Sequence, residues 1–450
     1  MRTLLERRFR LPENGTRVRT EILAGTTTFV TLSYILFVQP AVLSAAGMDF
    51  GAVLLATCVA SALGCVLMGL LANYPVAMAP AMGHNFYFAF TVCGATAAGG
   101  LAYAWQTALA ATFVAGALFV LLSAVGLREK LMEALPRSLQ LAIAGGIGLL
   151  IALVGLEWGG IVVERPGTLI GLGDLGAPPA RAALAGLLVA ALLLARRVRG
   201  AILMGIAVAT LVAAAEGLLE FSGPFGLPHI ERPAAFQLDL GGLFRHRESI
   251  VVILIFFFLA LFDTIGTLVG VATRAGLLVD GRLPRARRAL LADALGTTAG
   301  AVLGTSTITS YVESAAGVAE GGRTGLTALV VAVLFGLALF VSPLVQVVGG
   351  GVETATGRLY PTVAPALVVV GCLMLQPVSK VAWEDWTEGF PAFLTLVMMP
   401  FTFSITEGIA FGFMSYAALK LVAGRRREIH PLVALFAALF LLRAVFLGPG

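Results

Sequence analysis

Two acidic residues lie where a charge is costly. Asp263 is in the middle of an apolar run, Ile250–Ala272, that is long enough to cross a lipid bilayer. Glu313 follows in the stretch Ser306–Gly317, which is rich in small and apolar residues. A charge at the centre of a bilayer costs at least about 2.5–3.5 kcal/mol on insertion scales, so such residues usually serve a function. We therefore expect Asp263 and Glu313 to belong to one site near the bilayer centre.

Each carboxylate has a functional and a structural interpretation. Asp263 is predicted to accept a hydrogen bond from a ligand or to carry a proton; the alternative is a structural acid paired with a polar neighbour. Thr264, Gly266 and Thr267 make the surrounding helix face small and polar, which favours a water-filled cavity. Glu313 falls in the first turn of a predicted short helix, whose dipole stabilises the anion. A carboxylate at that place can accept N–H groups of a planar heterocycle.

A second set of candidates lies in the first half of the chain. Asn85 follows Gly83 and His84 at the start of another predicted short helix, and its amide can donate and accept as the edge of a nucleobase requires. The alternative for Asn85 is an ordinary helix N-cap. His84 either faces a cavity, where it would influence protonation, or lies at the membrane edge. Thr27 offers either a contact to the substrate or a hydrogen bond between helices. Gly83 and Thr27 are both included among the candidate substrate-binding residues.

The composition indicates a polytopic membrane protein. Of the 450 residues, 59% are hydrophobic and only 12% are charged, and the mean hydropathy is +0.96. Soluble domains carry about 25% charged residues. Basic loops that stay in the cytoplasm explain the net charge of +5, so no nucleic-acid partner is implied. The four cysteines lack metal-ligand spacing, so we expect free thiols and no metal site.

The apolar segments predict fourteen membrane spans with a cytoplasmic N-terminus. They are expected at Ile22–Ala46, Ala52–Ala72, Val76–Ala98, Tyr103–Gly126, Leu139–Gly155, Ala182–Ala195, Ala201–Leu219, Ile250–Ala272, Ala289–Leu303, Ser306–Ala319, Leu326–Val341, Thr362–Leu375, Pro391–Phe403 and Ile405–Ala423. With this count, most Arg and Lys residues beyond the N-terminus fall in cytoplasmic loops, as the positive-inside rule requires. A last apolar piece, Pro431–Leu447, either crosses the membrane or lies at its surface.

Spans 3 and 10 are predicted to be broken. The stretch Asn73–Gly83 contains two prolines, which disfavour a continuous helix and favour an extended piece before a helix start. The stretch Gly304–Ser310 is rich in threonine and is also expected to be extended. Seven spans in each half give the halves opposite orientations, and corresponding broken spans in such an inverted repeat indicate a transport site. The two extended pieces can pair with one another and leave helix N-termini at the centre.

At these motifs the chain resembles the nucleobase–cation symporter-2 family, and within it the AzgA-like permeases for adenine, guanine and hypoxanthine. The resemblance is carried by Asn73–Asn85, Phe262–Ala272 and Gly304–Gly325, with shorter matches at Pro391–Leu394 and Met399–Ile405. These pieces follow the family order over nearly the whole chain.

The resemblance implies an all-α polytopic fold with fourteen transmembrane segments in a 7+7 inverted repeat and short strands in spans 3 and 10. It implies a homodimer in which a core domain moves against a gate domain like an elevator. The implied segments are a cytoplasmic N-terminus (1–21), core-domain parts at 22–126 and 250–343, gate-domain parts at 139–220 and 361–423, an extracytoplasmic loop (221–249) and a C-terminal apolar segment (424–450).

The resemblance also implies roles for individual residues. The acid of span 8 and the glutamate of span 10 bind the base in this family, which assigns these roles to Asp263 and Glu313. The asparagine of span 3, here Asn85, would support them, and main-chain N–H groups near Tyr311 and Val312 would contact the ligand.

Three positions distinguish the chain within the family pattern. Thr267 stands where the pyrimidine branch has a histidine, which favours the purine branch. His84 and Phe86 replace an expected leucine-like residue and an expected alanine, and this departure leaves the preferred purine open.

The resulting prediction is a secondary active transporter of the inner cell membrane, not an enzyme. It would import adenine, guanine or hypoxanthine with a proton, using the proton gradient and no cofactor. Asp263 is favoured as the proton carrier over Glu313, because the helix dipole stabilises the Glu313 anion. The alternatives are a transporter of another solute (sulfate, urate or a pyrimidine) and a channel or membrane enzyme. Paired acids disfavour small anions, and no nucleophile–base set or metal cluster accompanies them.

Overall fold

The computed structural model describes residues 4–95, 100–125, 136–165, 167–221, 223–277, 283–354 and 357–446. The ends of the third and fourth predicted spans (96–98 and Gly126) and residue 447 of the last apolar piece lie outside these ranges. Within them, seven helices are long and apolar enough to cross a membrane, and four shorter helices are also apolar. The chain is therefore a multi-pass membrane protein, and the count of fourteen spans stays a prediction.

The first half of the chain is helical apart from three short strands. Its elements are α1 (Leu4–Phe9), α2 (Val18–Leu32), α3 (Ile35–Ser44), α4 (Phe50–Leu67), the π-helical turn η1 (Met68–Ala72), β1 (Met78–Pro80), α5 (Met82–Phe86), the π-helical turn η2 (Tyr87–Val92), α6 (Trp105–Val125), α8 (Arg137–Trp158), β2 (Val162–Arg165), β3 (Thr168–Leu172), α9 (Pro178–Ala195) and α10 (Ala201–Ala215).

The second half follows the same pattern. Its elements are α11 (Leu240–Leu243), α12 (Ser249–Arg274), α13 (Ala286–Leu303), β4 (Ile308–Ser310), α14 (Ser314–Ala319), α15 (Gly325–Ala338), α16 (Ser342–Gly349), β5 (Val352–Thr354), β6 (Gly357–Leu359), α17 (Ala364–Leu375), the 3₁₀ turn η4 (Gln376–Lys380), α18 (Trp386–Thr402), α19 (Ile405–Val422), the 3₁₀ turn η5 (Arg426–Glu428) and α20 (Pro431–Phe446).

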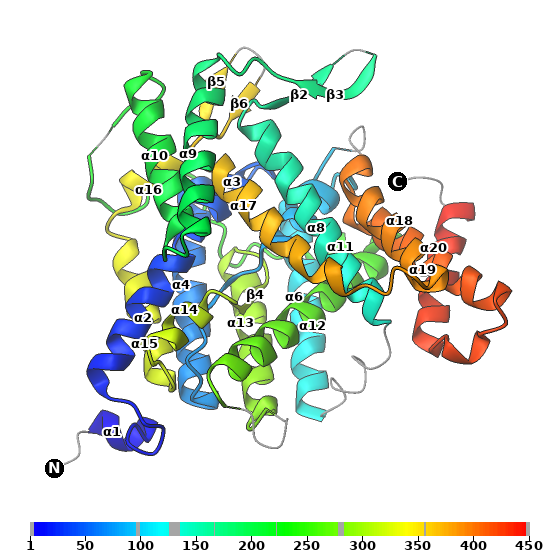
Figure 1. The fold of residues 1–450 in the computed structure, drawn as a ribbon, viewed down its shortest axis with the longest axis horizontal. Helices are drawn as coiled ribbons and strands as arrows, with labels where there is room; N and C mark the ends of the chain where they lie inside the picture. Colours follow the sequence, from blue (N-terminus) through cyan, green and yellow to red (C-terminus); the bar gives the residue numbers. More distant parts are fainter. Residues whose placement is uncertain are drawn as a thin grey trace.

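The helices pack in two groups (Figure 1). In the first group α6 packs against α13, α4 against α13 and α15, and α2 against α15. In the second group α8 packs against α17 and α18, α9 against α10, and α18 against α19. The boundaries of the core and gate domains, and any movement of one against the other, stay predictions.

The prediction of strands in the two broken spans is confirmed. β1 and β4 pair antiparallel, with Met78 opposite Ser310 and Pro80 opposite Ile308. The main-chain N–H of Ala81 continues the ladder to Thr307 at 2.8 Å. Each strand is followed by a short helix, α5 after β1 and α14 after β4. Buried strands are possible at this depth because each satisfies the other's main-chain groups.

The first predicted span differs from the expectation of one continuous helix. It is divided into α2 and α3 at Ser33 and Tyr34. The hydroxyl of Thr31 donates to the carbonyl of Thr27, and that of Ser33 donates to the carbonyl of Val30. Such bonds from hydroxyls back to the preceding turn bend helices. The break places Tyr34 in the interior, where it is 1% exposed.

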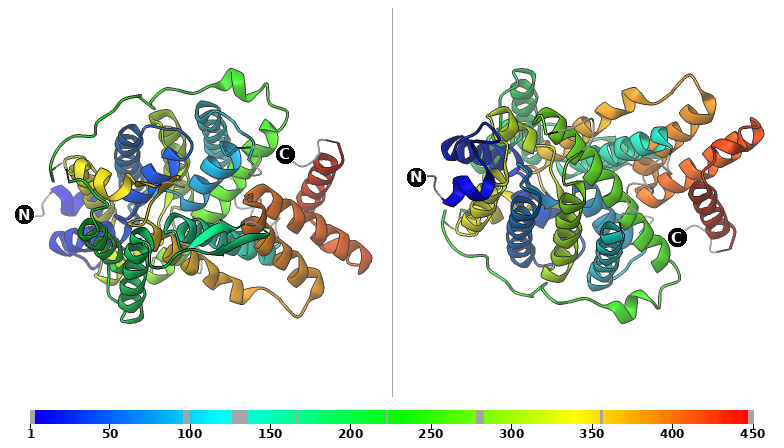
Figure 2. Two further views of the ribbon diagram at one scale, coloured as in Figure 1. Left: turned by 90° about the horizontal axis from the view of Figure 1, so that it is seen from above. Right: turned by 90° about the horizontal axis from the view of Figure 1, so that it is seen from below.

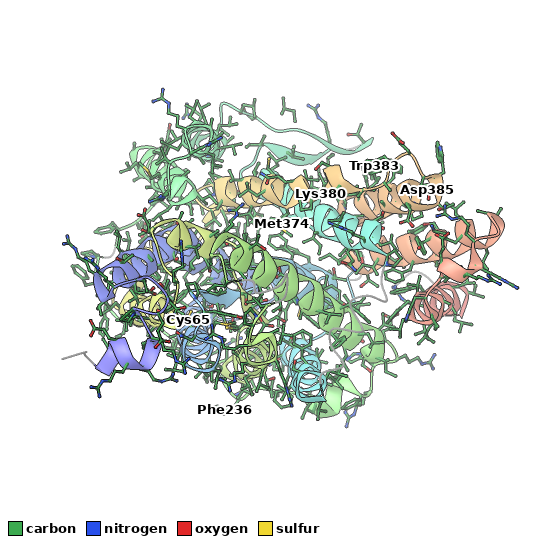
Figure 3. All side chains as sticks on the ribbon, turned by 60° about the horizontal axis from the view of Figure 1, so that its bottom comes forward. Cys65, Phe236, Met374, Lys380, Trp383 and Asp385 are labelled. Carbon is green, nitrogen blue, oxygen red and sulfur yellow. The ribbon has the colours of Figure 1, made fainter. Side chains whose placement is uncertain are left out.

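The segment between α10 and α12 runs along one edge of the molecule (Figure 2). It is attached to the first helix group, because the main-chain N–H of Gly226 donates to Phe340 and that of Phe236 donates to Val302. Figure 3 shows Phe236 at this outer edge. The first helix, α1, and the last, α20, lie far apart, and α20 packs against α19 (Figures 1 and 2).

Candidate functional site

A cavity of about 310 Å³ lies between the two helix groups. One wall comes from α5 and α12 of the first group, and the other comes from α8, α17 and η4 of the second. The lining residues are Gly83, His84, Gln140, Leu141, Ile143, Ala144, Ile147, Leu259, Asp263, Gly266, Thr267, Met374 and Pro377. Figure 3 shows Met374 in the middle of the molecule. A largely apolar pocket of this size with a few polar groups is typical of a small-molecule site.

Asp263 is the carboxylate that faces this cavity. It lies on α12 with Leu259 one turn before it and Gly266 and Thr267 one turn after it. Residues three and four apart share one face of a helix, so the sequence itself places Leu259, Asp263 and Thr267, with Gly266 between the last two, on the same side. The small residues after Asp263 leave its carboxylate open to the cavity, as the sequence predicted for this helix face.

Glu313 lies next to the cavity and does not belong to its lining. It comes directly before α14, and its carboxylate accepts a hydrogen bond from the hydroxyl of Tyr34 at 2.8 Å. Tyr34 lies at the junction between α2 and α3. Asp263 and Glu313 are nevertheless close enough for their charges to interact. The partnership with Tyr34 was not anticipated from the sequence.

A third acid close to Asp263, the fully buried Asp293, was not predicted from the sequence. It lies on α13, is fully buried, and accepts a hydrogen bond from the hydroxyl of Thr264 at 2.7 Å. It also accepts from the hydroxyl of Thr309 at 3.2 Å and from the main-chain N–H of Ser310 at 3.3 Å. Asp293 therefore connects α12, next to Asp263, with strand β4. The rule that singled out Asp263, an acid within an apolar span, applies equally to Asp293.

Asn85 is fully buried and does not line the cavity. Its side-chain oxygen accepts a hydrogen bond from the hydroxyl of Ser306, while its amide nitrogen has no partner among the described residues. Ser306 also receives a hydrogen bond from Gln39 at 3.3 Å. In this structure Asn85 thus joins the two broken spans to each other, behind the cavity wall.

The remaining candidates are placed as follows. The main-chain N–H of Tyr311 donates to Ala77 at 3.0 Å, so it extends the strand ladder and is not free for a ligand in this structure. Val312 has 55% of its surface exposed. Thr27 is half-buried on α2 and lies outside the lining of the cavity. Gly83 and His84 both line it.

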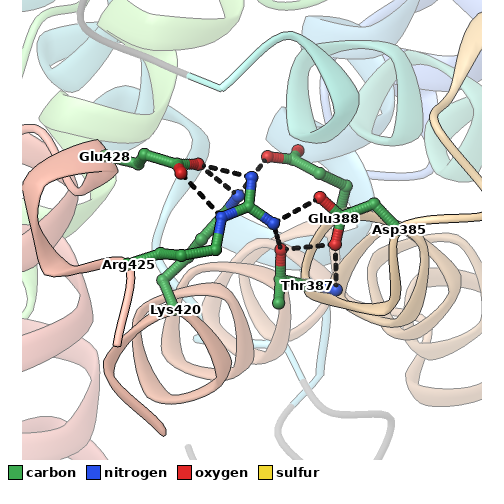
Figure 4. Close-up of polar contacts among 6 residues, drawn as sticks. All are labelled: Asp385, Thr387, Glu388, Lys420, Arg425 and Glu428. Carbon is green, nitrogen blue, oxygen red and sulfur yellow. Dashed lines mark hydrogen bonds and ion pairs between the residues drawn. The ribbon is translucent and has the colours of Figure 1, made fainter. Parts of the chain in front are cut away.

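A cluster of charges at the far end of the second helix group contrasts with the cavity (Figure 4). Lys420 pairs with Glu388 at 2.9 Å and with Glu428 at 2.8 Å, and Arg425 pairs with Asp385 at 2.6 Å. The hydrogen bonds from Arg425 and Lys420 lower the pKa of Glu428 to about 2. Those from Arg425 and Thr387 hold the pKa of Asp385 well below its usual range.

The chemical groups around the cavity limit what it can do. Within the described ranges no group of three or more His, Cys, Asp or Glu is placed to hold a metal ion. Cys65 is a free thiol packed against β1, whose Met78 N–H donates to its sulfur at 3.1 Å. The cavity is lined by one carboxylate (Asp263), one imidazole (His84), the polar residues Gln140 and Thr267, and an apolar wall, which suits a flat, partly polar molecule.

Comparison with known proteins decides the family. The model of a permease family matches residues 19–411. The chain belongs to this family, the nucleobase–cation symporters-2. It is 45% identical to the guanine/hypoxanthine permease PbuO of Bacillus subtilis, over 98% of this chain and 100% of that protein. It is 42% identical to the adenine permease AdeP of Escherichia coli, over 99% of this chain and 96% of that protein.

Solved structures show the same fold. The transmembrane domain of the cyanobacterial bicarbonate transporter BicA superposes with a TM-score of 0.57 at 14% identity, covering 95% of this chain and 97% of that one. The overall structure of SLC26A9 superposes with a TM-score of 0.60 at 13% identity, covering 90% of this chain and 66% of that one. The expected transporter fold and the expectation of a permease, not an enzyme, are therefore confirmed.

Proposed function

We propose that this permease imports a purine nucleobase, namely adenine, guanine or hypoxanthine, by proton symport with elevator-like alternating access. The observation that carries the proposal is Asp263, a carboxylate open to a cavity of about 310 Å³ between the two helix groups. The relatives named above, an adenine permease and a guanine/hypoxanthine permease, support the choice of purines.

Asp263 is the proposed acceptor for an N–H group of the base. A carboxylate binds such a donor more strongly than a neutral acceptor does, and more so in a cavity with an apolar wall. Glu313, held by Tyr34 beside the cavity, is the second proposed acceptor, reached when Tyr34 or the base shifts. Asn85, the N–H groups near Tyr311 and Val312, and Thr27 and Gly83 complete the proposed site as supporting positions.

The proposed coupling follows from charge. Asp263 lies near both Asp293 and Glu313, and three negative charges in a poorly solvated interior repel one another. A proton taken up with the base removes one of these charges before the site moves through the membrane, where a charge is costly. We assign the coupling proton to Asp263, because the carboxylate of Glu313 is already stabilised by the Tyr34 hydroxyl. The energy source is then the proton gradient, with no cofactor.

The proposal also covers the membrane location, topology and assembly of the protein. It is placed in the inner cell membrane with fourteen spans, a cytoplasmic N-terminus and a homodimeric assembly. Elevator movement would carry the cavity wall formed by α5 and α12 past the wall formed by α8 and α17.

The test is uptake of radiolabelled adenine and hypoxanthine in cells that lack purine transporters of their own. Adenine, guanine and hypoxanthine should compete, and a protonophore should abolish accumulation above the external concentration. Competition by uracil alone would contradict the choice of purines. Uptake that only equilibrates, and that ignores the protonophore, would indicate a channel.

A further inference from the structure

His84 combines deep burial with a place on the cavity wall. Its side chain is 1% exposed to solvent, yet it lines the cavity together with Gly83 and Asp263. Its Nε2 atom has no hydrogen-bond partner among the described residues. An unpaired polar atom at such a place is unfavourable unless a ligand or water meets it.

The orientation of the ring is fixed from behind. The imidazole stacks on Phe256 of α12, with ring centres 6.4 Å apart and an angle of 20° between the planes. The ring is also hydrogen-bonded to the main chain of Phe256. Phe256 lies within the regular helix α12, whose N–H groups are used inside the helix, so the main-chain partner is the carbonyl and the imidazole donates.

This arrangement determines what the other nitrogen can do. A neutral imidazole has one donor and one acceptor nitrogen. With the donor turned to Phe256, the lone pair is on Nε2, a buried atom of a residue that lines the cavity wall. Asp263 on the neighbouring helix presents a second acceptor to the same space. A solute that satisfies both must carry two separate N–H donors.

We propose that His84 is a specificity-determining residue whose Nε2 accepts a hydrogen bond from an N–H group of the transported base. The inference rests on the proposed function and deepens it, since it selects bases with two N–H groups at different edges. Bases in which one of these positions is methylated are excluded by loss of that bond. The leucine-like residue expected at this position from the family pattern could not make it.

The experiment is a double-mutant-type cycle in which the protein residue and the matching position of the ligand are changed, first separately and then together. Uptake of adenine and hypoxanthine is measured for the wild type and for His84→Leu, in competition with analogues methylated singly at each N–H position. In the wild type, methylation of the N–H that meets His84 should weaken competition about ten-fold, as the loss of one hydrogen bond predicts, and methylation of the N–H that meets Asp263 should weaken it as well. His84→Leu should raise the KM for the parent base by a similar factor, change kcat less, and make the first of these two methylations harmless.

Controls separate this role from a structural one. His84→Gln places an amide oxygen near Nε2 and should restore part of the discrimination. His229→Leu, the same change at an exposed residue of the α10–α12 segment, should leave the analogue pattern unchanged. If His84→Leu is unstable in thermal unfolding, His84→Phe, which keeps a flat ring but has no acceptor, takes its place.

The outcomes also separate the two proposals. If the wild type transports no purine, the proposed function itself fails. If the wild type transports purines and His84→Leu (or, where that variant is unstable, His84→Phe) responds to every methylated analogue as the wild type does, only the role of His84 is overturned. If His84→Leu weakens competition by all analogues equally, the role of His84 is likewise contradicted. Such a uniform loss indicates a packing defect, which does not distinguish one N–H group of the base from another.

Discussion

The acidic residues of this protein occur in two kinds of surroundings, one with ion pairs and one without. At the far end of the second helix group, Asp385, Glu388 and Glu428 are each paired with Lys420 or Arg425. At the cavity, no ion pair to Asp263 or Glu313 is found among the described residues. Paired charges stabilise a fixed arrangement of elements. Acids held only by hydroxyl and N–H groups keep the capacity to gain a ligand or a proton.

The largest effect is expected at Asp263. Asp263→Asn removes the charged acceptor while keeping the size of the side chain, so purine uptake should fall by about 100-fold, the upper range for a lost charge-assisted hydrogen bond. Glu428→Gln, the same kind of change in the paired cluster, should leave uptake close to the wild-type value. The measurement is the initial rate of radiolabelled uptake, normalised to protein in the membrane. Equal losses in the two variants would remove the contrast.

Asp293 tests whether the third acid is structural. Asp293→Ala leaves the hydroxyls of Thr264 and Thr309 and the N–H of Ser310 without their buried acceptor. The free energy of unfolding should fall by about 3 kcal/mol, as expected for unsatisfied buried polar groups. Thermal unfolding of the purified protein measures this, with Asp293→Asn as the milder control. A melting temperature unchanged in Asp293→Ala would show that these bonds do not hold β4 to α12.

Tyr34 tests how Glu313 is positioned. Tyr34→Phe deletes only the hydroxyl that donates to Glu313 and keeps the packing of the ring. The KM for purine should change about three- to ten-fold, the effect of one hydrogen bond, and the melting temperature should change little. Uptake kinetics over a range of substrate concentrations give both constants. A kinetic profile identical to the wild type would exclude Glu313 from the binding site or Tyr34 from its support.

The smallest effect is expected in the paired cluster. Because the folded pKa of Glu428 lies near 2, below its usual value of 4.5, its ion pairs stabilise the fold at pH above about 4.5. That contribution is lost as the pH falls from 4.5 towards 2. Glu428→Gln should therefore melt slightly below the wild type at pH 7, and the gap should close as the pH is lowered to 3. A gap that widens in acid would reverse the assignment.

The sequence predicted two features: the acid inside an apolar span, and the pairing of the extended pieces at matching places in the two halves of the chain. Asp263 stood out because a charge inside an apolar span is expensive, and the cavity indeed opens onto it. The pairing of β1 with β4 followed from prolines in one half and threonines at the matching place in the other. Both inferences use local composition and one symmetry rule, so they did not need the folded structure.

Side-chain contacts between residues far apart in the sequence could not be predicted from local composition. Tyr34, at the junction of α2 and α3, and Glu313, before α14, are 279 residues apart in the sequence, so no local pattern signals their hydrogen bond. Asn85 was expected at the ligand, and its burial against Ser306 depends on the side-chain rotamers behind the strands. Asp293 was different, because its sequence signal was the same as that of Asp263 and was overlooked.

The central claim is that Asp263 couples a purine to a proton in this cavity. Its most direct test is purine accumulation in proteoliposomes with an imposed pH gradient, acidic outside, comparing the wild type with Asp263→Asn. The account predicts that the wild type accumulates labelled adenine or hypoxanthine above the external concentration, and only while the gradient lasts, and that the variant does not. Gradient-driven accumulation by Asp263→Asn at the wild-type level would contradict it.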